Sequence, residues 1–94
     1  MGLDDLRQKI DAIDRDLVDL FQRRMDLSAE IARYKQEHNL PIHDPAREEQ
    51  KLRDLSALDI KGREASLCAL YCLIFELSRA EQEQILKLPS EQVQ

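Results

Sequence analysis

Polar side chains occupy helix positions where apolar ones are expected, in three separate segments of the sequence. Arg24 stands on the apolar seam of a first predicted helix, and Lys35 follows along the edge of that seam. Glu48 extends the apolar stripe of a second helix, while Ser78 and Gln82 interrupt the stripe of a third. A charge on a buried helix face is costly unless a group of opposite charge meets it. Together these residues predict a polar cavity inside a helical bundle, suited to an anion.

Each of these residues taken alone also has a purely structural explanation. A single arginine on an apolar seam often sets the register of helix pairing, and a serine inside a helix often bonds to the preceding turn. Lys35 and Arg47 would ordinarily be solvated ends of a charged face. The convergence of cations, an amide, a hydroxyl and a carboxylate on one interior favours the cavity over these separate explanations.

The types of residue in this set favour binding and electrostatics over covalent catalysis. No histidine partners Ser78 within its helix, as a nucleophilic serine would need, and the sequence shows no metal-ligand cluster or glycine-rich phosphate loop. Cys68 and Cys72 lie four residues apart in an apolar pattern, which is typical of small core residues. Arginine matches carboxylates geometrically, and lysine and glutamine can donate to an ether or hydroxyl oxygen. We expect a small ligand carrying carboxylates and no metal or organic cofactor.

Three helices must position these side chains, which predicts an all-α fold of one long and two shorter helices. Apolar residues recur at alternating steps of three and four, the spacing of a helix seam, with Arg24 as the exception. The seam consists of Leu3, Leu6, Ile10, Ile13, Leu17, Leu20, Leu27, Ile31 and Tyr34. Stop and start signals at Asn39, Pro41, Asp44-Pro45 and Gly62 place helices at about 4–38, 45–58 and 64–88. Residues 89–94 follow as a tail or the start of a linker. We expect residues 1–94 to form a single domain.

The length of the first helix predicts a homodimer. About 35 residues make a rod of roughly 50 Å, whereas a compact chain of this size has a diameter of about 32 Å. The apolar seam of the protruding part therefore needs cover from a second chain. Arg7 lies seventeen residues before Arg24, or about 25 Å along the axis, so one small ligand cannot touch both in one chain. In a two-fold pair of long helices, Arg7 of the partner subunit can reach the region between Arg24 and Lys35.

Composition limits the partners and the compartment. Charged residues make up 35% of the chain, aromatic residues 4%, and the formal charge is −5, which disfavours nucleic acid and anionic membranes as partners. No apolar run approaches the length of a membrane span, and no signal-peptide pattern precedes Asp4. We therefore expect a cytoplasmic protein.

Several short motifs agree in order, spacing and helix placement with one known family. They are Leu6-Arg7-Gln8-Lys9-Ile10-Asp11-Ala12-Ile13-Asp14, Arg23-Arg24-Met25-Asp26-Leu27, Lys35, Asp44-Pro45-Ala46-Arg47-Glu48, and Ser78 with Gln82 four residues later. This pattern resembles the all-helical chorismate mutases, most closely the small dimeric bacterial type that also forms the N-terminal domain of bifunctional chorismate mutase–prephenate dehydratases. The resemblance covers the chain from Leu3 to about Leu86. It implies an intertwined homodimer that rearranges chorismate to prephenate in phenylalanine and tyrosine biosynthesis.

The resemblance also implies a role for each polar residue. Arg7 of the partner subunit and Arg24 would clamp the substrate carboxylates, with Ser78 as a further carboxylate contact. Lys35 would donate to the breaking ether oxygen and to a carboxylate, and Gln82 would be the second donor to the ether oxygen.

The remaining residues would hold the rest of the substrate. Glu48 and the backbone of Asp44 would hold the ring hydroxyl. Arg47 would support the carboxylate pocket and orient Glu48.

Two other functions stay open on the sequence. Isochorismate pyruvate lyase is a homologous activity on a related substrate and shares the cationic cavity. A non-catalytic helical dimer, acting as an adaptor or regulatory module, would bind no such diacid. The sequence leaves open whether the chain is free-standing or belongs to a bifunctional enzyme.

Overall fold

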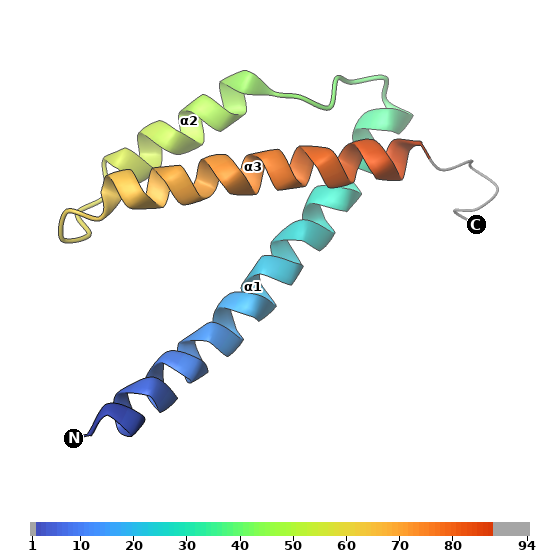
Figure 1. Ribbon diagram of the computed structural model, residues 1–94. Coiled ribbons are helices and arrows are strands. Elements are labelled where there is room, and N and C mark those ends of the chain that lie inside the picture. The colour runs from blue at the N-terminus through green and yellow to red at the C-terminus, as the bar shows by residue number, and fades with distance from the viewer. Residues whose placement is uncertain (1, 88–94) are drawn as a thin grey trace.

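The computed structural model describes residues 2–87 and contains three α-helices, with no strand in that range (Figure 1). They are α1 (Leu3–Glu37), α2 (Pro45–Ser56) and α3 (Glu64–Leu86). The predicted all-α fold of one long and two shorter helices is confirmed. The predicted end of the third helix at Leu88 and the predicted tail at 89–94 lie outside the described residues.

Local signals in the sequence set the start of α2. The Asp44 side chain accepts a hydrogen bond from the backbone N–H of Arg47 at 3.1 Å, and Pro45 occupies the first helical position. The helix ends at Ser56, two residues before the predicted end at Leu58. Its last turn tightens because the Leu58 N–H bonds to the carbonyl of Leu55 at 3.2 Å, three residues back, which leaves Leu58 outside the helix and 46% exposed.

The connection between α2 and α3 is a tight turn held at its far end by Glu64. Lys61 and Gly62 both have positive φ, 60° and 77°, a region that glycine enters without a steric penalty. The Glu64 carboxylate accepts a hydrogen bond from the backbone N–H of Ile60 at 3.0 Å. This bond, first among several backbone contacts, lowers the pKa of Glu64 below its ordinary value. The turn reverses the chain and lays α3 alongside α2.

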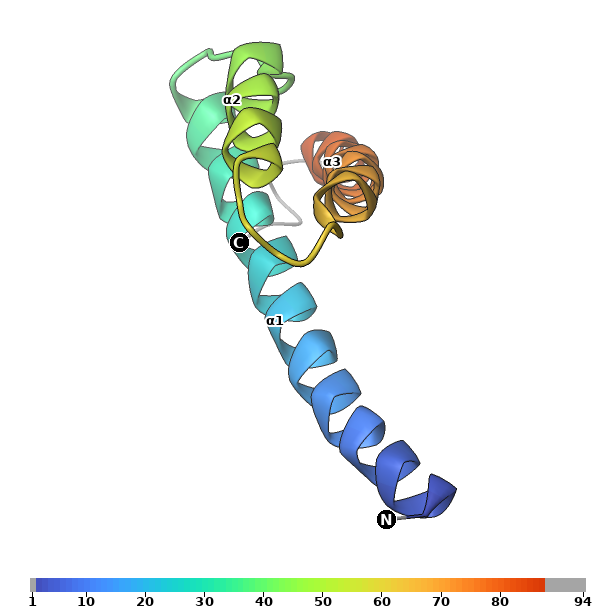
Figure 2. The ribbon, with the colours of Figure 1, turned by 90° about the vertical axis from the view of Figure 1, so that its left-hand side faces the viewer.

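The two shorter helices lie at one end of the long one. In Figures 1 and 2, α3 runs beside α2 and crosses the C-terminal half of α1, whereas the N-terminal half of α1 extends away from both. The chain measures 55 × 30 × 14 Å, with a radius of gyration of 17.1 Å. A compact chain of this length would have a radius of gyration of about 12 Å. The long helix protrudes, as predicted.

A single chain has almost no core of its own. Among the described residues only Ala32, Phe75, Ser78 and Gln82 are buried, and two of these are polar. Every apolar residue of the predicted seam, from Leu3 to Tyr34, is between 46% and 62% exposed. Leu70 of α3 is 52% exposed because neither α1 nor α2 covers its side of that helix within one chain. No helix in residues 2–87 combines the length and apolar character needed to cross a membrane.

Candidate active site

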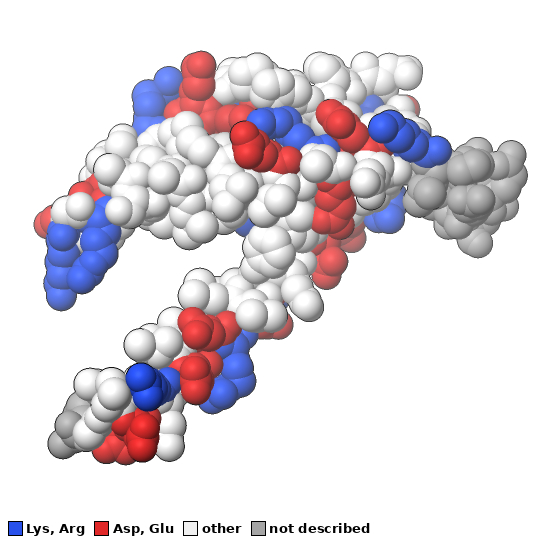
Figure 3. All heavy atoms as spheres, in the orientation of Figure 1, with Lys and Arg blue, Asp and Glu red and all other residues white. Residues whose placement is uncertain are grey.

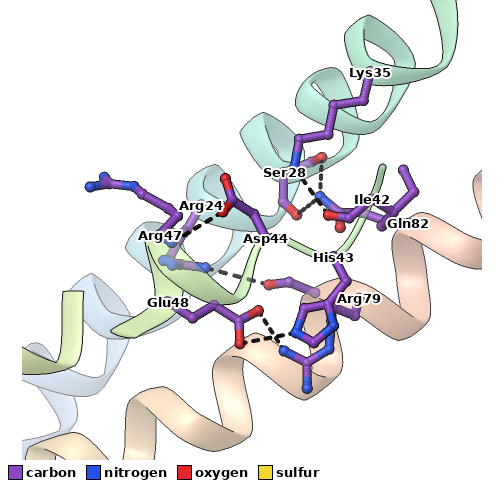
Figure 4. A network of polar contacts seen from close by, with 11 residues as sticks. Arg24, Ser28, Lys35, Ile42, His43, Asp44, Arg47, Glu48, Arg79 and Gln82 are labelled. Atoms are coloured by element: carbon purple, nitrogen blue, oxygen red, sulfur yellow. Dashed lines mark hydrogen bonds and ion pairs between the residues drawn. The ribbon is translucent and has the colours of Figure 1, made fainter. Parts of the chain in front are cut away.

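A cleft of about 510 Å³ lies between the C-terminal half of α1, the α1–α2 connection, α2 and α3. Its wall contains seven of the eight side chains predicted for the site, which are Arg24, Lys35, Asp44, Arg47, Glu48, Ser78 and Gln82. Other wall residues are Leu27, Ser28, Ile31, Ile42, Lys51, Tyr71, Phe75 and Arg79. Figure 4 shows most of the polar members drawn together from the different elements. The structure thus brings together residues up to 58 positions apart in the sequence, from Arg24 to Gln82.

Arg24 enters the cleft from α1 without a carboxylate partner in the described part of the chain. Its Nη1 donates to the Ser78 hydroxyl at 3.4 Å. Its guanidinium carbon lies 5.6 Å from the ring centre of Tyr71 and 5.8 Å from that of Phe75, both on α3. Aromatic faces stabilise a cation without neutralising it. The charge of the guanidinium is therefore not compensated by a carboxylate among the described residues, and most of its five N–H donors remain available to a ligand.

The two polar residues of α3 are buried and tie that helix to α1. Gln82 is 7% exposed, and its amide nitrogen donates to both the backbone carbonyl and the hydroxyl of Ser28, each at 2.9 Å. Since a carbonyl oxygen only accepts, this contact fixes which end of the amide faces Ser28. Ser78 is 8% exposed and its hydroxyl lies 3.5 Å from the Met25 sulfur. Neither polar group is left without a partner at the helix interface.

Lys35 lies at the other end of the cleft and holds the α1–α2 connection. Its Nζ donates to the backbone carbonyl of Ile42 at 3.0 Å. The contact crosses from α1 to the segment just before α2 and so helps to close that end of the cleft (Figure 4). An ammonium group has three hydrogens, so two remain for a ligand after this bond forms.

Glu48 is paired with a residue that the sequence analysis did not predict. Its carboxylate forms an ion pair with Nη1 of Arg79 on α3, and its other oxygen lies 3.7 Å from Nε2 of His43 (Figure 4). Arg47, which the resemblance implies as the residue that orients Glu48, forms no ion pair with it among the described residues. Successive helical residues point about 100° apart, so Glu48 faces α3 while the Arg47 side chain stays exposed and contributes its backbone N–H to the Asp44 cap.

Sequence patterns could have pointed to two further cations of the cleft. Arg79 follows Ser78 directly and lies three residues before Gln82, so it borders the same face of α3. Lys51 lies one helical turn after Glu48 on α2. Both resemble ordinary solvated charges in the sequence, and only the packing of α2 against α3 places them in the wall.

The wall of the cleft is positive although the chain is acidic. Five cations and two carboxylates contribute to the wall, whereas the whole chain has a formal charge of −5. Figure 3 shows acidic and basic side chains intermixed over the visible face, without a broad patch of one sign. The excess of cations is thus local to the cleft and suits a small anion.

Arg7 does not line the cleft. It lies on the protruding half of α1, seventeen residues before Arg24, which corresponds to about 25 Å along the helix axis. One chain therefore cannot bring Arg7 and Arg24 to the same small ligand.

Residues 2–87 contain no cluster of three or more His, Cys, Asp or Glu side chains able to hold a metal ion. Cys68 is half-buried, with Sγ 3.7 Å from the Leu52 carbonyl. Cys72, expected in the core, is exposed in the single chain, on a side of α3 that the other helices do not cover.

The family described as chorismate mutase type II matches residues 6–83, which include every predicted site residue. The chain belongs to this family. Its fold is that of helical chorismate mutases. A crystal structure of chorismate mutase from Helicobacter pylori in complex with prephenate is 39% identical and has a TM-score of 0.83, covering 93% of this chain and 97% of that one.

Further relatives support membership of the chorismate mutase family. Chorismate mutase from Thermus thermophilus is 32% identical, with a TM-score of 0.81 over 86% of this chain and 93% of that structure. The T-protein of Haemophilus influenzae is 37% identical over 68 residues, or 72% of this chain but only 17% of the relative. The 4-amino-4-deoxychorismate mutase of Streptomyces venezuelae is 48% identical over 42 residues, 45% of this chain and 41% of the relative. The chain thus spans a minor part of these two curated relatives.

Proposed function

We propose that this chain catalyses the rearrangement of chorismate to prephenate. The observation that carries the proposal is the convergence of Arg24, Lys35 and Gln82 on one positive cleft. Arg24 has no carboxylate partner there among the described residues, and Lys35 has spare donors. Chorismate is a dicarboxylate with an ether oxygen, so its anionic groups match the donors that the cleft offers.

The reaction needs a particular substrate conformation and stabilisation of growing charge. Arg24 holds one carboxylate and so keeps the enolpyruvyl arm over the ring, in the geometry from which the new carbon–carbon bond forms. As the ether C–O bond breaks, negative charge grows on its oxygen. Lys35 and Gln82 donate to that oxygen and stabilise the transition state more than the ground state. No proton transfer or covalent intermediate is required.

Gln82 changes partners when substrate binds. In the structure both amide hydrogens are directed to Ser28, one to its carbonyl and one to its hydroxyl. The bond to the carbonyl keeps the amide oriented, while the hydroxyl bond is exchanged for the ether oxygen. The donor is thus held close to its working position before binding, which lowers the free energy of reorganisation during the reaction.

A homodimer completes the proposed site. The exposed seam of α1 supplies an apolar surface along the whole helix, and pairing with a second copy would cover it. Arg7 of the partner subunit then binds the second carboxylate. The dimer works in the cytoplasm, where its substrate and product belong to aromatic amino acid biosynthesis.

An assay of the purified protein tests the activity. Chorismate absorbance should fall with time, and the product should be identified as prephenate by its acid-catalysed conversion to phenylpyruvate. Isochorismate and 4-amino-4-deoxychorismate should be assayed in parallel, with slower turnover expected for both. Release of pyruvate from isochorismate as the main activity would instead establish a lyase. Absence of saturable binding of all three compounds would indicate a non-catalytic helical module.

A further inference from the structure

The ion pair between Arg79 and Glu48 is part of the wall of the cleft and not of its outer surface. Glu48 has 23% of its side chain exposed and Arg79 has 28%, and both residues face the cleft. The pair joins α2 to α3, and His43 from the α1–α2 connection approaches the second carboxylate oxygen at 3.7 Å. Figure 4 shows the Arg79 guanidinium and the His43 ring close together, both facing the Glu48 carboxylate.

Pairing with arginine changes what a carboxylate offers to a ligand. A lone carboxylate in a cleft attracts a cationic group on the ligand through its net charge. A carboxylate already neutralised by a guanidinium keeps lone pairs that accept a hydrogen bond from a neutral hydroxyl. Its attraction for an ammonium group is offset by the nearby arginine, because two cations would then share one anion.

We infer that Arg79 determines specificity at the ring substituent facing Glu48, by favouring a neutral hydroxyl over a charged amino group. This inference rests on the proposed function, in which Glu48 accepts the ring hydroxyl of chorismate. Within the cleft, Arg79 is the cation in contact with this carboxylate among the described residues. Arg47 and Lys51 on α2 line the same cleft but form no ion pair with Glu48 there. Arg79 is thus a positioning and specificity residue, acting through Glu48.

The experiment compares kcat/KM for chorismate with kcat/KM for 4-amino-4-deoxychorismate, which differ in this substituent. In Arg79→Met, Glu48 regains its net charge, and the ratio should shift toward the amino substrate by about tenfold or more, equivalent to about 1.4 kcal/mol. Arg79→Lys keeps a cation in place and should retain most of the native preference. Lys51→Met is the matched control, because it also removes one positive charge from the wall of the cleft, at a residue that is not paired with Glu48. It should lower both kcat/KM values alike and change their ratio by less than about threefold.

A second variant moves the ratio in the opposite direction. Glu48→Gln removes the carboxylate and leaves Arg79 unpaired, so activity falls for both substrates while the preference for the hydroxyl rises further. The Glu48→Gln measurement still tests the inference if Arg79→Met does not fold. A ratio that Arg79→Met leaves within about twofold of native, or that Glu48→Gln moves toward the amino substrate, would overturn the inference. Neither result would affect the proposed function, which fails only if the native protein does not convert chorismate to prephenate.

Discussion

Replacement of Arg24 by leucine separates the contribution of this residue to stability from its contribution to function. The substitution restores the apolar repeat of α1 at its one exception. It removes one long hydrogen bond to Ser78 and two contacts with the rings of Tyr71 and Phe75. These interactions sum to about 2 kcal/mol, with each ring contact at about 0.5–1 kcal/mol. A leucine on the seam regains a similar amount, about 2 kcal/mol, by burying its side chain without a charge to desolvate.

The expected change in unfolding free energy is therefore below about 1 kcal/mol, which corresponds to a shift in Tm of less than about 8 °C. Function should change far more. Loss of charge-assisted bonds to a substrate carboxylate costs about 3 kcal/mol, or about 10²-fold in kcat/KM. Ser78 cannot replace the missing charge, since its hydroxyl is neutral. A thermal melt without ligand and steady-state kinetics on the same preparation measure the two effects.

The neighbouring arginine provides a matched control. Arg23 has a side chain that is 68% exposed and forms a surface ion pair with Asp19 at 3.7 Å, away from the cleft. Arg23→Leu removes the same charge from the same helix and should change Tm and kcat/KM little, because exposed ion pairs contribute little. The reasoning is refuted if Arg24→Leu lowers Tm by more than about 15 °C while kcat/KM stays native, because Arg24 would then be a structural residue.

Lys35→Ala should fold and lower kcat by about 10²–10³, the usual effect of removing a donor to developing negative charge, and near-native turnover would exclude that role. The Arg7→Ala and Lys35→Ala proteins, each inactive alone, should regain activity when they are mixed and their subunits exchange, because each heterodimer then has one intact site. A mixture that stays inactive after exchange would place Arg7 outside the shared site. Because the folded protein lowers the pKa of Glu64, this carboxylate stabilises the fold at pH values above its ordinary pKa of 4.5, and the stabilisation is lost as the pH falls through the lowered pKa. Glu64→Gln should therefore flatten the acid limb of a curve of Tm against pH. An unchanged acid limb would contradict this prediction.

The helices and their starts were accessible to sequence reasoning because their causes are local. An apolar repeat fixes one face of α1, and Asp44 with Pro45 starts α2 through contacts within one turn. The early end of α2 at Ser56 escaped prediction, since Leu58 continues the apolar spacing while its backbone bonds three residues back. The exposure of α1 along its seam was likewise predictable, because helix length follows from residue count alone.

The sequence by itself determined Arg24, Ser78 and Gln82 as candidates for one cleft, because each interrupts an otherwise apolar helix face. It could not determine which charges pair across that cleft. Glu48 meets Arg79 and not its neighbour Arg47, and the Gln82 amide meets Ser28. Such partners lie on different helices, and a rotation of one residue turns a side chain by about 100°, so the packing of α3 against α1 and α2 decides them. Tertiary structure thus set the electrostatic character of the site, by adding Arg79 and Lys51 to the residues that the sequence had named.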